Sequence, residues 1–297
     1  MRVLVTGASG FLGSQIMDLY NKGEFNFTLY GTSTSQQNEL FRLDITDVKS
    51  VREKILRLDP DCIINCAAMA DVDQCERKPD LARAVNSIGA KNLAGICRST
   101  GARLLQISTD SVFDGVVGGY TELSRPNPIN AYAATKYDGE KAVISILRNY
   151  VVIRTNFYGH NHDGKYLMNW ILSHLIDNER IIGFIDSRFN PLWIRDLAYC
   201  IIKLIDLPYR GILNCSGDEV FSKYQFIRKI ALDLGYRNDN IQKGTSAQVP
   251  LTARRPNNTY LVNKKMHKLL KVKIHRLEEV LRHSEFDFYR SSMPKKI

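Results

Sequence analysis

The sequence predicts an α/β protein, built on a doubly wound parallel sheet of the Rossmann type with a smaller C-terminal lobe. Three observations predict this class. Short apolar runs alternate with stretches of helical spacing through the first half of the chain. These runs are continuous rather than alternating, as in parallel strands covered on both faces. A glycine-rich turn also follows the first run directly, between a strand and a helix.

The expected elements follow one another in strand–helix order. In the first half we predict strands at residues 2–5, 27–30, 62–66, 104–108 and 151–154, with helices at 12–20, 48–58, 79–97 and 131–147. In the second half we predict helices at 165–176, 192–207 and 222–234, the last capped by Ser222, and a strand at 211–215. Repeated strand–helix units imply right-handed crossovers within one sheet.

The composition is that of a soluble globular protein. Of 297 residues, 44% are hydrophobic and 24% are charged. No apolar run approaches the roughly 20 residues that span a bilayer, and the opening segment is too short and too interrupted by glycine to be a signal peptide. The six cysteines show no CxxC pair and no zinc-like spacing with histidine. We therefore expect a cytoplasmic protein with buried thiols, no membrane partner and no metal site.

The positive charge is concentrated near the C-terminus. The chain has 41 Lys and Arg against 31 Asp and Glu, a formal charge of +10, and residues 254–297 hold twelve basic and four acidic residues, a net of +8. Such a segment can meet nucleic acid, an anionic membrane or an anionic small molecule, or it can be a solvated surface. The composition leaves these alternatives open.

A glycine turn opens the first helix. Gly7, Gly10 and Gly13 follow the spacing GxxGxxG directly after the first strand. Gly7 permits a tight turn, Gly10 lets a phosphate approach the backbone, and Gly13 allows the helix to pack closely on the strand. The helix N-terminus then faces a pyrophosphate. At this place in the chain the pattern predicts a dinucleotide site.

The end of the second strand bears on which dinucleotide is bound. An NAD site usually has an acidic residue there, which binds the ribose 2′-hydroxyl. This chain has Thr32 and Ser33 instead, and no acid before Glu39. Hydroxyl groups can donate to a 2′-phosphate, and no carboxylate repels it. The sequence therefore favours NADP(H) and leaves NAD(H) open, because no arginine lies in the turn.

Tyr132 and Lys136 lie four residues apart in a predicted helix. This spacing puts both side chains on one helix face, about 6 Å apart along the axis. An ammonium group there favours the phenolate, so we expect the tyrosine pKa to be lowered. A tyrosine so placed can exchange a proton with a carbonyl oxygen. With the glycine turn and the Ser108–Thr109 pair, the two residues predict a reductase site.

These features give the chain a specific resemblance to the extended short-chain dehydrogenase/reductases, and more narrowly to the dTDP-4-dehydrorhamnose reductase family. The resemblance extends over about residues 1–283. Besides the glycine turn, the motifs that carry it are Leu43–Asp47, Asn65–Ala68, Val72–Asp73, Glu76, Asn86, Ile107–Gly115, Tyr120–Glu122, Pro128–Lys141, Arg154–Thr155, Asn190–Pro191, Arg195–Ala198, Ser216–Asp218 and Arg255–Pro256.

The resemblance implies roles by position. Thr109 matches the hydroxyl that binds the C4 carbonyl, Tyr132 the general acid, and Lys136 the lysine that binds the nicotinamide ribose. The implied substrate contacts are Asp110, Asn156, Trp193 and Arg255, of which Arg255 lies near the diphosphate. The implied cofactor contacts are Gly7, Ser9, Gly10, Phe11, Leu12, Gly13, Thr32, Ser33, Asp44, Ile45, Ala67, Ala68, Tyr132 and Lys136.

The resemblance also implies a reaction and a domain plan. NADPH would deliver hydride to C4 of a 4-keto-6-deoxy sugar nucleotide, in deoxysugar and polysaccharide biosynthesis. An NADP-binding Rossmann domain would span residues 1–158 and take up the chain again at about 190–215. A substrate-binding lobe would comprise 159–189 and 216–290, and 291–297 would be a frayed tail. The sugar nucleotide supplies the anion for the basic segment, so no nucleic-acid partner is expected. A homodimer stays open.

Three neighbouring functions are weighed beside this one. Sugar-nucleotide dehydratases carry Thr-Asp-Glu where this chain has Thr109-Asp110-Ser111, so the base for eliminating water is missing. A sugar-nucleotide epimerase/reductase would need a proton acceptor such as His160 or His162, which we interpret as exposed loop residues. The regulatory β subunit of methionine adenosyltransferase resembles the chain in fold, binds NADP and keeps the Tyr–Lys pair. The motifs therefore leave a binding role open.

Overall fold

The structure is a computed structural model that describes residues 1–35, 40–161 and 166–291. A seven-stranded sheet forms its centre, in the order β11-β6-β5-β4-β1-β2-β3, and all its neighbouring pairs are parallel. The strands are β1 (Arg2–Thr6), β2 (Thr28–Ser33), β3 (Phe41–Arg42), β4 (Cys62–Asn65), β5 (Arg103–Thr109), β6 (Tyr150–Thr155) and β11 (Gly211–Cys215). The order reverses between β1 and β4, the place where ligands bind in open α/β sheets.

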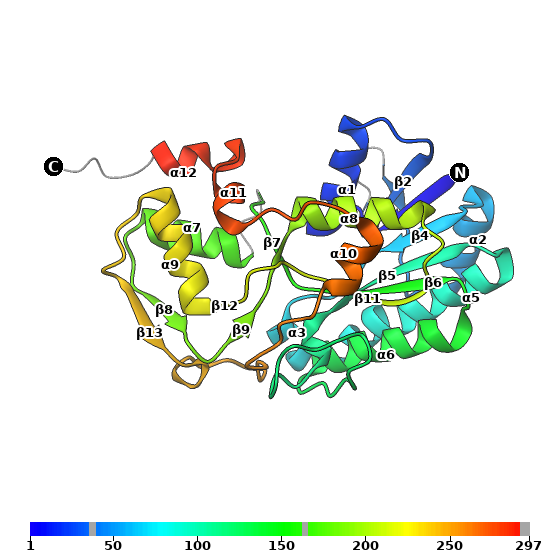
Figure 1. The fold of residues 1–297 in the computed structure, drawn as a ribbon. Helices are drawn as coiled ribbons and strands as arrows, with labels where there is room; N and C mark the ends of the chain where they lie inside the picture. Colours follow the sequence, from blue (N-terminus) through cyan, green and yellow to red (C-terminus); the bar gives the residue numbers. More distant parts are fainter. Residues whose placement is uncertain (36–39, 162–165, 292–297) are drawn as a thin grey trace.

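Helices cover both faces of this sheet (Figure 1). On one face lie α1 (Phe11–Lys22) and α8 (Ile194–Asp206), and on the other α2 (Val48–Leu58), α5 (Ala90–Thr100) and α6 (Ala131–Ile146). Alternate side chains of β1 are buried in two separate hydrophobic cores. Val3 and Val5 pack with α1 and α8, whereas Leu4 packs with α2 and α5. This explains why the strand is apolar throughout. The doubly wound α/β class predicted from the sequence is confirmed.

A smaller lobe lies beside the carboxyl ends of the strands (Figure 1). Its helices are α7 (Leu167–Ile176), α9 (Lys223–Leu234), α11 (Leu277–Leu281) and α12 (Asp287–Ser291), and β8 (Ile181–Phe184) pairs in parallel with β13 (Ile241–Gly244). Two short pairs lie near the junction: β7 (Phe157–Tyr158) with β10 (Leu192–Trp193), and β9 (Arg188–Phe189) with β12 (Phe221–Ser222). The core of the α1 and α8 face continues into the lobe through Phe226 and Ile230.

Some elements differ from the sequence prediction. The single helix expected at 79–97 is α4 (Pro79–Arg83), a π-helical turn at Ala84–Gly89, and then α5. The predicted helix at 192–207 begins only at Ile194, because Leu192–Trp193 forms β10. Helix α3 (Val72–Arg77) was not predicted. Helix α10 (Lys264–Leu270) falls within the stretch assigned to the lobe, yet it packs on β11 and α8.

Two sequence predictions reach beyond the described part of the chain. Of the tail expected to be frayed, Ser291 ends α12 and the remaining residues lie outside the described residues. The helix predicted from 165 also begins outside them, and its described part starts at Leu167. By contrast, the predicted Ser222 cap is confirmed: its hydroxyl accepts the N–H of Gln225, and the Gln225 side chain accepts the N–H of Ser222.

Candidate active site

The glycine turn is shaped by two close backbone contacts. Gly7 has φ +67°, and a Cβ there would lie 2.7 Å from the backbone of Ala67 at the end of β4. A Cβ on Gly13 would lie 2.2 Å from the carbonyl oxygen of Gly7. Side chains at either position would force the turn, the helix and the neighbouring strand apart. Both glycines therefore have the structural roles predicted from the sequence.

The N-terminus of α1 opens onto a cavity of about 400 Å³. Gly10 precedes the helix and has no side chain to cap it, so the first helical N–H groups are available to an anion. The residues that line the cavity are Gly7, Ser9, Gly10, Ser33, Thr34, Leu43, Asp44, Ile45, Cys66, Ala67, Ala68, Met69, Gln74, Leu81 and Val85. An uncapped helix end beside a cavity of this size fits the pyrophosphate and adenosine of a dinucleotide.

Eight of the fourteen predicted cofactor residues line this cavity, and six do not: Phe11, Leu12, Gly13, Thr32, Tyr132 and Lys136. The Thr32 hydroxyl points back to the carbonyl of Val5, 3.3 Å away, and the residue is buried. Phe11 and Leu12 also have buried side chains, so only their backbone N–H groups can face a phosphate. The structure instead brings Thr34 to the cavity, beside Ser33. Thr34 was missed because a run of hydroxyl residues does not show which of them faces outward.

A catalytic cluster lies where β5 meets α6. Thr109 ends β5, and the Asn130 side chain caps α6 by accepting the N–H of Ala133 at 2.8 Å. The cap starts the helix just before Tyr132, whose phenol is hydrogen-bonded to the Thr109 hydroxyl. Lys136 is buried one turn further on, and its Nζ donates to the carbonyl of Ile107 at 2.6 Å. The structure thus brings the three predicted catalytic residues together.

The acidities of this cluster differ from expectation. Burial raises the pKa of Tyr132 to about 12, although its hydrogen bond with Thr109 opposes this shift. The expected lowering by Lys136 is wrong for this state, because burial outweighs it and the ammonium group is directed at Ile107. Burial also lowers the pKa of Lys136 to about 8, against the attraction of Glu140. Tyr132 is therefore protonated at neutral pH, as a proton donor must be.

Asp110 connects the catalytic cluster to the smaller lobe. Its buried carboxylate accepts the Thr259 hydroxyl at 2.5 Å and the Asn156 amide at 2.8 Å. Burial raises its pKa, and the nearby Lys223 of the lobe opposes that shift. Lys223 lies with Nζ 3.4 Å from the centre of the Phe189 ring, and burial lowers its pKa to about 8. Two of the predicted substrate residues, Asp110 and Asn156, thus meet directly beside Thr109.

The sequence did not predict Thr259 or Lys223 at this site. Both lie more than 110 positions from Asp110 and carry no motif. Only the packing of the lobe on the sheet brings them to the strand end. The local sequence shows Lys223 as the residue after a helix cap, which is usually exposed.

Trp193 and Arg255 have hydrogen-bond partners outside the catalytic cluster. Trp193 is buried, and its indole N–H is 3.3 Å from the carboxylate of Glu285, which favours a packing role. Arg255 donates to the carboxylate of Asp73 at 2.9 Å, so its charge is already paired. This pair ties α3 to the segment that precedes Pro256. Neither side chain contacts Thr109 through these bonds, whereas Asp110 accepts the Thr109 hydroxyl and links Asn156 to it.

One of the two loop histidines, His160, is placed differently from expectation. His160 is half-buried, and its Nε2 lies 2.7 Å from the hydroxyl of Tyr289. It is thus packed in the lobe rather than exposed. His162 lies outside the described residues.

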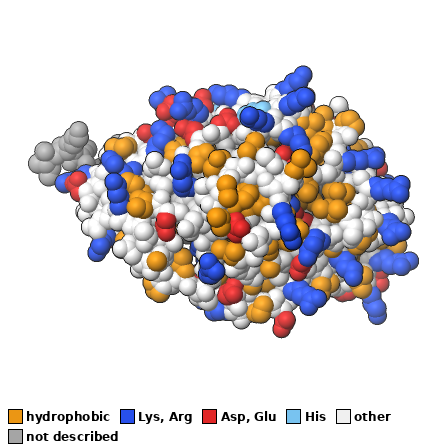
Figure 2. Space-filling model, turned by 60° about the horizontal axis from the view of Figure 1, so that its bottom comes forward, with side chains coloured by type: hydrophobic (Ala, Val, Ile, Leu, Met, Phe, Trp, Pro, Cys, Tyr) orange, Lys and Arg blue, Asp and Glu red, His pale blue; other side chains and the backbone are white. Residues whose placement is uncertain are grey.

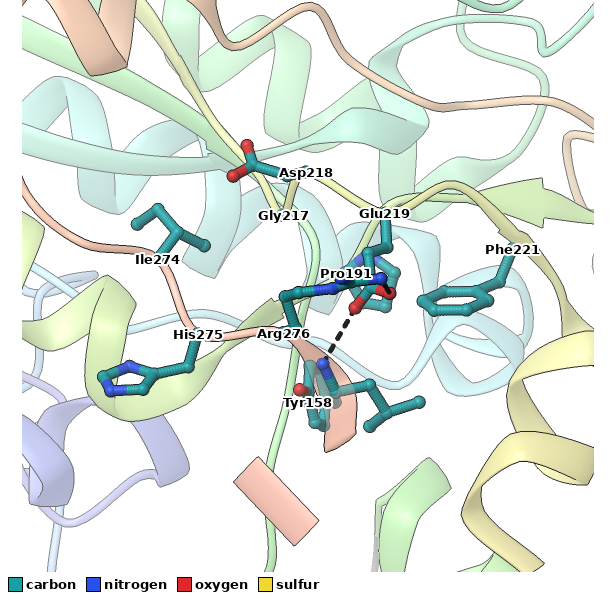
Figure 3. A pocket seen from close by; sticks show the side chains of 10 residues that line it. Tyr158, Pro191, Gly217, Asp218, Glu219, Phe221, Ile274, His275 and Arg276 are labelled. Carbon is teal, nitrogen blue, oxygen red and sulfur yellow. Dashed lines mark hydrogen bonds and ion pairs between the residues drawn. The ribbon is translucent and has the colours of Figure 1, made fainter. Parts of the chain in front are cut away.

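A second, narrow pocket is lined by Tyr158, Glu219 and Arg276, among other residues (Figure 3). Glu219 accepts from Arg276 at 3.3 Å and from the N–H of Leu277 at 2.8 Å. The buried Tyr158 hydroxyl faces it without a hydrogen-bond partner among the described residues. The pocket has a volume of about 10 Å³, which suits at most one water molecule. It is therefore too small to be the substrate site.

Metal clusters and membrane-spanning helices are both absent from residues 1–35, 40–161 and 166–291. No group of three or more His, Cys, Asp or Glu side chains within these ranges is arranged to hold a metal ion. None of the helices in the same ranges combines the length and apolar character that crossing a bilayer requires.

Comparisons with known proteins agree with this geometry. The dTDP-4-dehydrorhamnose reductase of Mycobacterium tuberculosis is 33% identical over 261 residues, covering 86% of this chain and 82% of the relative. The methionine adenosyltransferase 2 subunit beta of Xenopus laevis is 30% identical over 281 residues, covering 90% and 82%. The crystal structure of dTDP-4-dehydrorhamnose reductase from Bacillus anthracis in complex with NADP superposes with a TM-score of 0.83 at 31% identity, over 94% of this chain and 96% of that one.

The family match extends over nearly the whole chain. Residues 1–287 match the family described as RmlD substrate binding domain. The matched stretch includes the glycine turn, the cluster of Thr109, Tyr132 and Lys136, and almost the whole lobe. The chain belongs to the RmlD family of the extended short-chain dehydrogenase/reductases.

Proposed function

We propose that the protein reduces the C4 ketone of a 4-keto-6-deoxy sugar nucleotide with NADPH. The observation that carries this proposal is the hydrogen-bonded pair of Thr109 and Tyr132, with buried Lys136 one turn away. This cluster lies at the carboxyl end of β5, on the same edge of the sheet as the glycine turn. A dehydrogenase needs a proton donor and a cofactor at one place, and this edge has both.

The chemistry follows from the side chains. When bound, the reduced nicotinamide supplies a hydride to C4 of the ketone. Thr109 donates a hydrogen bond to the ketone oxygen, where negative charge develops. Tyr132, held protonated by burial, transfers its phenolic proton to that oxygen and leaves a secondary alcohol. The Lys136 ammonium group then stabilises the tyrosinate until it takes up a proton from solvent.

The residues of the cavity fit NADP. The uncapped N-terminus of α1 would hold the pyrophosphate, with Ser9 beside it. Ser33 ends β2, and its hydroxyl lies 2.9 Å from that of Ser9, so both can reach the adenosine ribose or its 2′-phosphate. Asp44 and Ile45 line the same cavity and would contact the adenine. A related reductase is known in complex with NADP, which supports this cofactor.

We propose that the lobe made of residues 159–189 and 216–290 closes over the sugar nucleotide. Asp110 and Asn156 lie beside Thr109 and would contact the sugar hydroxyls. Lys223 reaches the same place from the lobe and supplies a positive charge there. For Arg255 to contact the diphosphate, its guanidinium would have to exchange Asp73 for the phosphate. Helix α10 stays with the sheet rather than with the lobe.

A second function has its own support. Relatives named as methionine adenosyltransferase 2 subunit beta match the chain at 30% identity, and a regulatory subunit could bind NADP without reducing a sugar. The half-buried, protonated Tyr132 beside Thr109 favours the reductase, since a binding role needs no proton donor at the nicotinamide end.

NADPH oxidation decides between the two functions. The chain is mixed with NADPH and, in turn, dTDP-, UDP- and GDP-linked 4-keto-6-deoxy sugars, starting with dTDP-4-keto-6-deoxy-L-mannose, and absorbance at 340 nm is followed. We expect turnover with at least one of them, faster with NADPH than with NADH. Tight NADPH binding without oxidation by any of these ketones would contradict the reductase and support the regulatory role.

A further inference from the structure

A buried acid follows Lys136 by one helical turn. Tyr132, Lys136 and Glu140 are spaced by four residues on α6, so they lie along one face of the helix. Glu140 is completely buried, and Lys136 is only 5% exposed. The reaction as described uses the tyrosine and the lysine and leaves the acid without a role. A carboxylate with no exposed surface is costly unless something compensates it.

Three groups hold the Glu140 carboxylate in place. Arg154 on β6 donates Nε to one oxygen at 3.0 Å and Nη2 to the other at 2.7 Å, a bidentate pair. Ser108 on β5 donates its hydroxyl at 2.5 Å. The carboxylate therefore connects α6 to two strands of the sheet. One of the groups that hold it, Ser108, directly precedes the catalytic residue Thr109.

Glu140 is also the carboxylate that acts on Lys136. The groups that stabilise the lysine ammonium electrostatically are Glu140, Cys66 and Cys75, of which Glu140 has the largest effect. Burial raises the pKa of the Cys66 thiol to about 12 and that of Cys75 to about 11, so both are neutral at physiological pH. Burial alone disfavours a charged lysine. The negative charge that counters it comes from Glu140.

We propose that Glu140 is a positioning residue for the reaction: clamped by Arg154 and Ser108, it keeps the Lys136 side chain charged and directed at the Ile107 carbonyl and the cofactor cleft. The inference rests on the proposed function and extends it. Arg154 acts indirectly, by holding the carboxylate. A purely structural ion pair would anchor α6 equally well, but it would not affect how activity depends on pH.

Substitutions that remove the charge test this. Glu140→Gln alone leaves Arg154 buried and unpaired, which destabilises the fold. The double variant Glu140→Gln/Arg154→Met removes both charges together, and Glu140→Asp keeps the charge but withdraws it by one methylene. For each we measure kcat/KM against pH from 6 to 10 with NADPH and dTDP-4-keto-6-deoxy-L-mannose. Asp196→Asn is the matched control, because Asp196 lies on α8 rather than α6 and is a buried carboxylate that is paired with His275.

We expect the variants to displace the alkaline limb of the pH profile, the part in which kcat/KM falls as the pH rises. In the wild type we expect kcat/KM to fall as the pH rises through about 8, because burial lowers the pKa of Lys136 to about 8. In the double variant this limb moves at least one pH unit lower, which is a loss of about fivefold at pH 8 that approaches tenfold above about pH 9. Glu140→Asp gives a smaller displacement in the same direction, and the Asp196→Asn limb stays at the wild-type pH. A folded double variant or Glu140→Asp variant with the wild-type limb would overturn the proposal.

NADPH affinity separates this inference from the function itself. Lys136 is proposed to bind the nicotinamide ribose, so the NADPH dissociation constant should rise as the pH rises and Lys136 loses its charge. In the double variant this rise should begin at a lower pH than in the wild type. This readout needs no turnover. A wild type that oxidises no NADPH would contradict the proposed function, while a displaced pH dependence of binding would still support the role of Glu140. Identical binding profiles in wild type and variants would contradict that role.

Discussion

Tyr132 is the residue on which the proposed chemistry depends most. Its phenol combines a hydrogen bond to Thr109 with a pKa raised by burial to about 12. An acid of this kind stays protonated through the physiological range and gives up its proton only to a strong base, such as a developing alkoxide. The nearby Lys136 becomes useful after that transfer, when the tyrosinate needs a positive neighbour.

Replacing this tyrosine tests the assignment. In Tyr132→Phe we expect kcat to fall at least about 100-fold, because general acid catalysis is worth that much. The NADPH dissociation constant should stay within about threefold of wild type, since the phenyl ring still fills the site. Tyr137→Phe, one turn along the same helix, is the control and keeps its turnover. Unchanged turnover in Tyr132→Phe would show that another group is the acid.

At the scale of single residues, the sequence predicted contacts between residues at helical spacing. It did not predict contacts between residues that only folding brings together. The helical spacing of Tyr132 and Lys136 was enough to place them together. It could not show that burial, rather than the lysine, dominates the acidity of the tyrosine. Thr259 and Lys223 reach Asp110 from the other end of the chain. No local pattern reports such a contact, because it arises only when the lobe packs on the sheet.

The glycine turn and α1 are the element whose local shape the sequence describes best. A strand, three glycines and an amphipathic helix appear in the predicted order, and the backbone contacts of Gly7 and Gly13 explain two of the glycines. The strand pairs β8–β13 and β9–β12 were not predicted. They are two to four residues long and join segments far apart in the sequence, so neither alternation nor length marks them.

The π-helical turn at Ala84–Gly89 shows a different limit of prediction from sequence. Its periodicity resembles that of an ordinary helix, and we predicted one. In the structure, Asn86 uses its side chain to bond both the N–H and the carbonyl of Met69, at 2.9 and 3.0 Å, and also reaches Thr135 at 3.1 Å. The turn thus fixes the loop after β4 against the catalytic helix. Such turns are frequent near functional sites, but their register depends on these tertiary contacts.

Two glycine substitutions test the account of the turn. Gly13→Ala puts a Cβ 2.2 Å from the Gly7 carbonyl, so we expect a loss of about 1–3 kcal/mol in the free energy of unfolding and weaker NADPH binding. Gly95→Ala, in the exposed middle of α5, meets nothing within 4 Å. It should gain about 0.5–1 kcal/mol and bind NADPH normally. Urea unfolding and fluorescence titration measure both. Equal effects of the two substitutions would contradict the close contact.

The basic charge looks different on the folded molecule than along the chain. Figure 2 shows Lys and Arg side chains dispersed over the face it presents, among hydrophobic and acidic ones. Several basic residues of the C-terminal segment are paired with acids, including Arg255 with Asp73, Arg276 with Glu219 and Lys273 with Glu279. The excess of charge therefore does not form one continuous patch on this face, and a small anionic substrate remains the partner we propose.

The six cysteines make the whole molecule sensitive to alkali. Burial raises the pKa of Cys62, Cys66, Cys97 and Cys200 from 9.0 to about 12, that of Cys75 to about 11, and that of Cys215 further. A group whose pKa is raised by folding stabilises the native state below its unfolded pKa. That stability is lost as the pH rises from about 9 towards 12, because the unfolded chain releases its protons first.

We therefore expect the free energy of unfolding, measured in urea with a reductant, to fall between pH 9 and 10.5. Two lysines whose pKa is lowered to about 8, Lys136 and Lys223, act the other way between about 8 and 10.5, but the six thiols outnumber them. Cys200→Ala should lower the slope by one proton, about 1.4 kcal/mol per pH unit at most. A free energy that is constant from pH 8 to 10.5 would contradict this account of the core.

The central claim is that the edge of the sheet joining the glycine turn to Tyr132 is a hydride-transfer site, and isotope transfer tests it most directly. The protein is given NADPH deuterated at C4 of the nicotinamide, together with dTDP-4-keto-6-deoxy-L-mannose, and the sugar nucleotide is analysed by mass spectrometry and NMR. We predict one deuterium at C4 of the reduced sugar, and at most about one hundredth as much labelled product in a parallel reaction with Tyr132→Phe over the same initial period. Deuterated NADPH that stays bound and intact beside an unreduced ketone would contradict the claim.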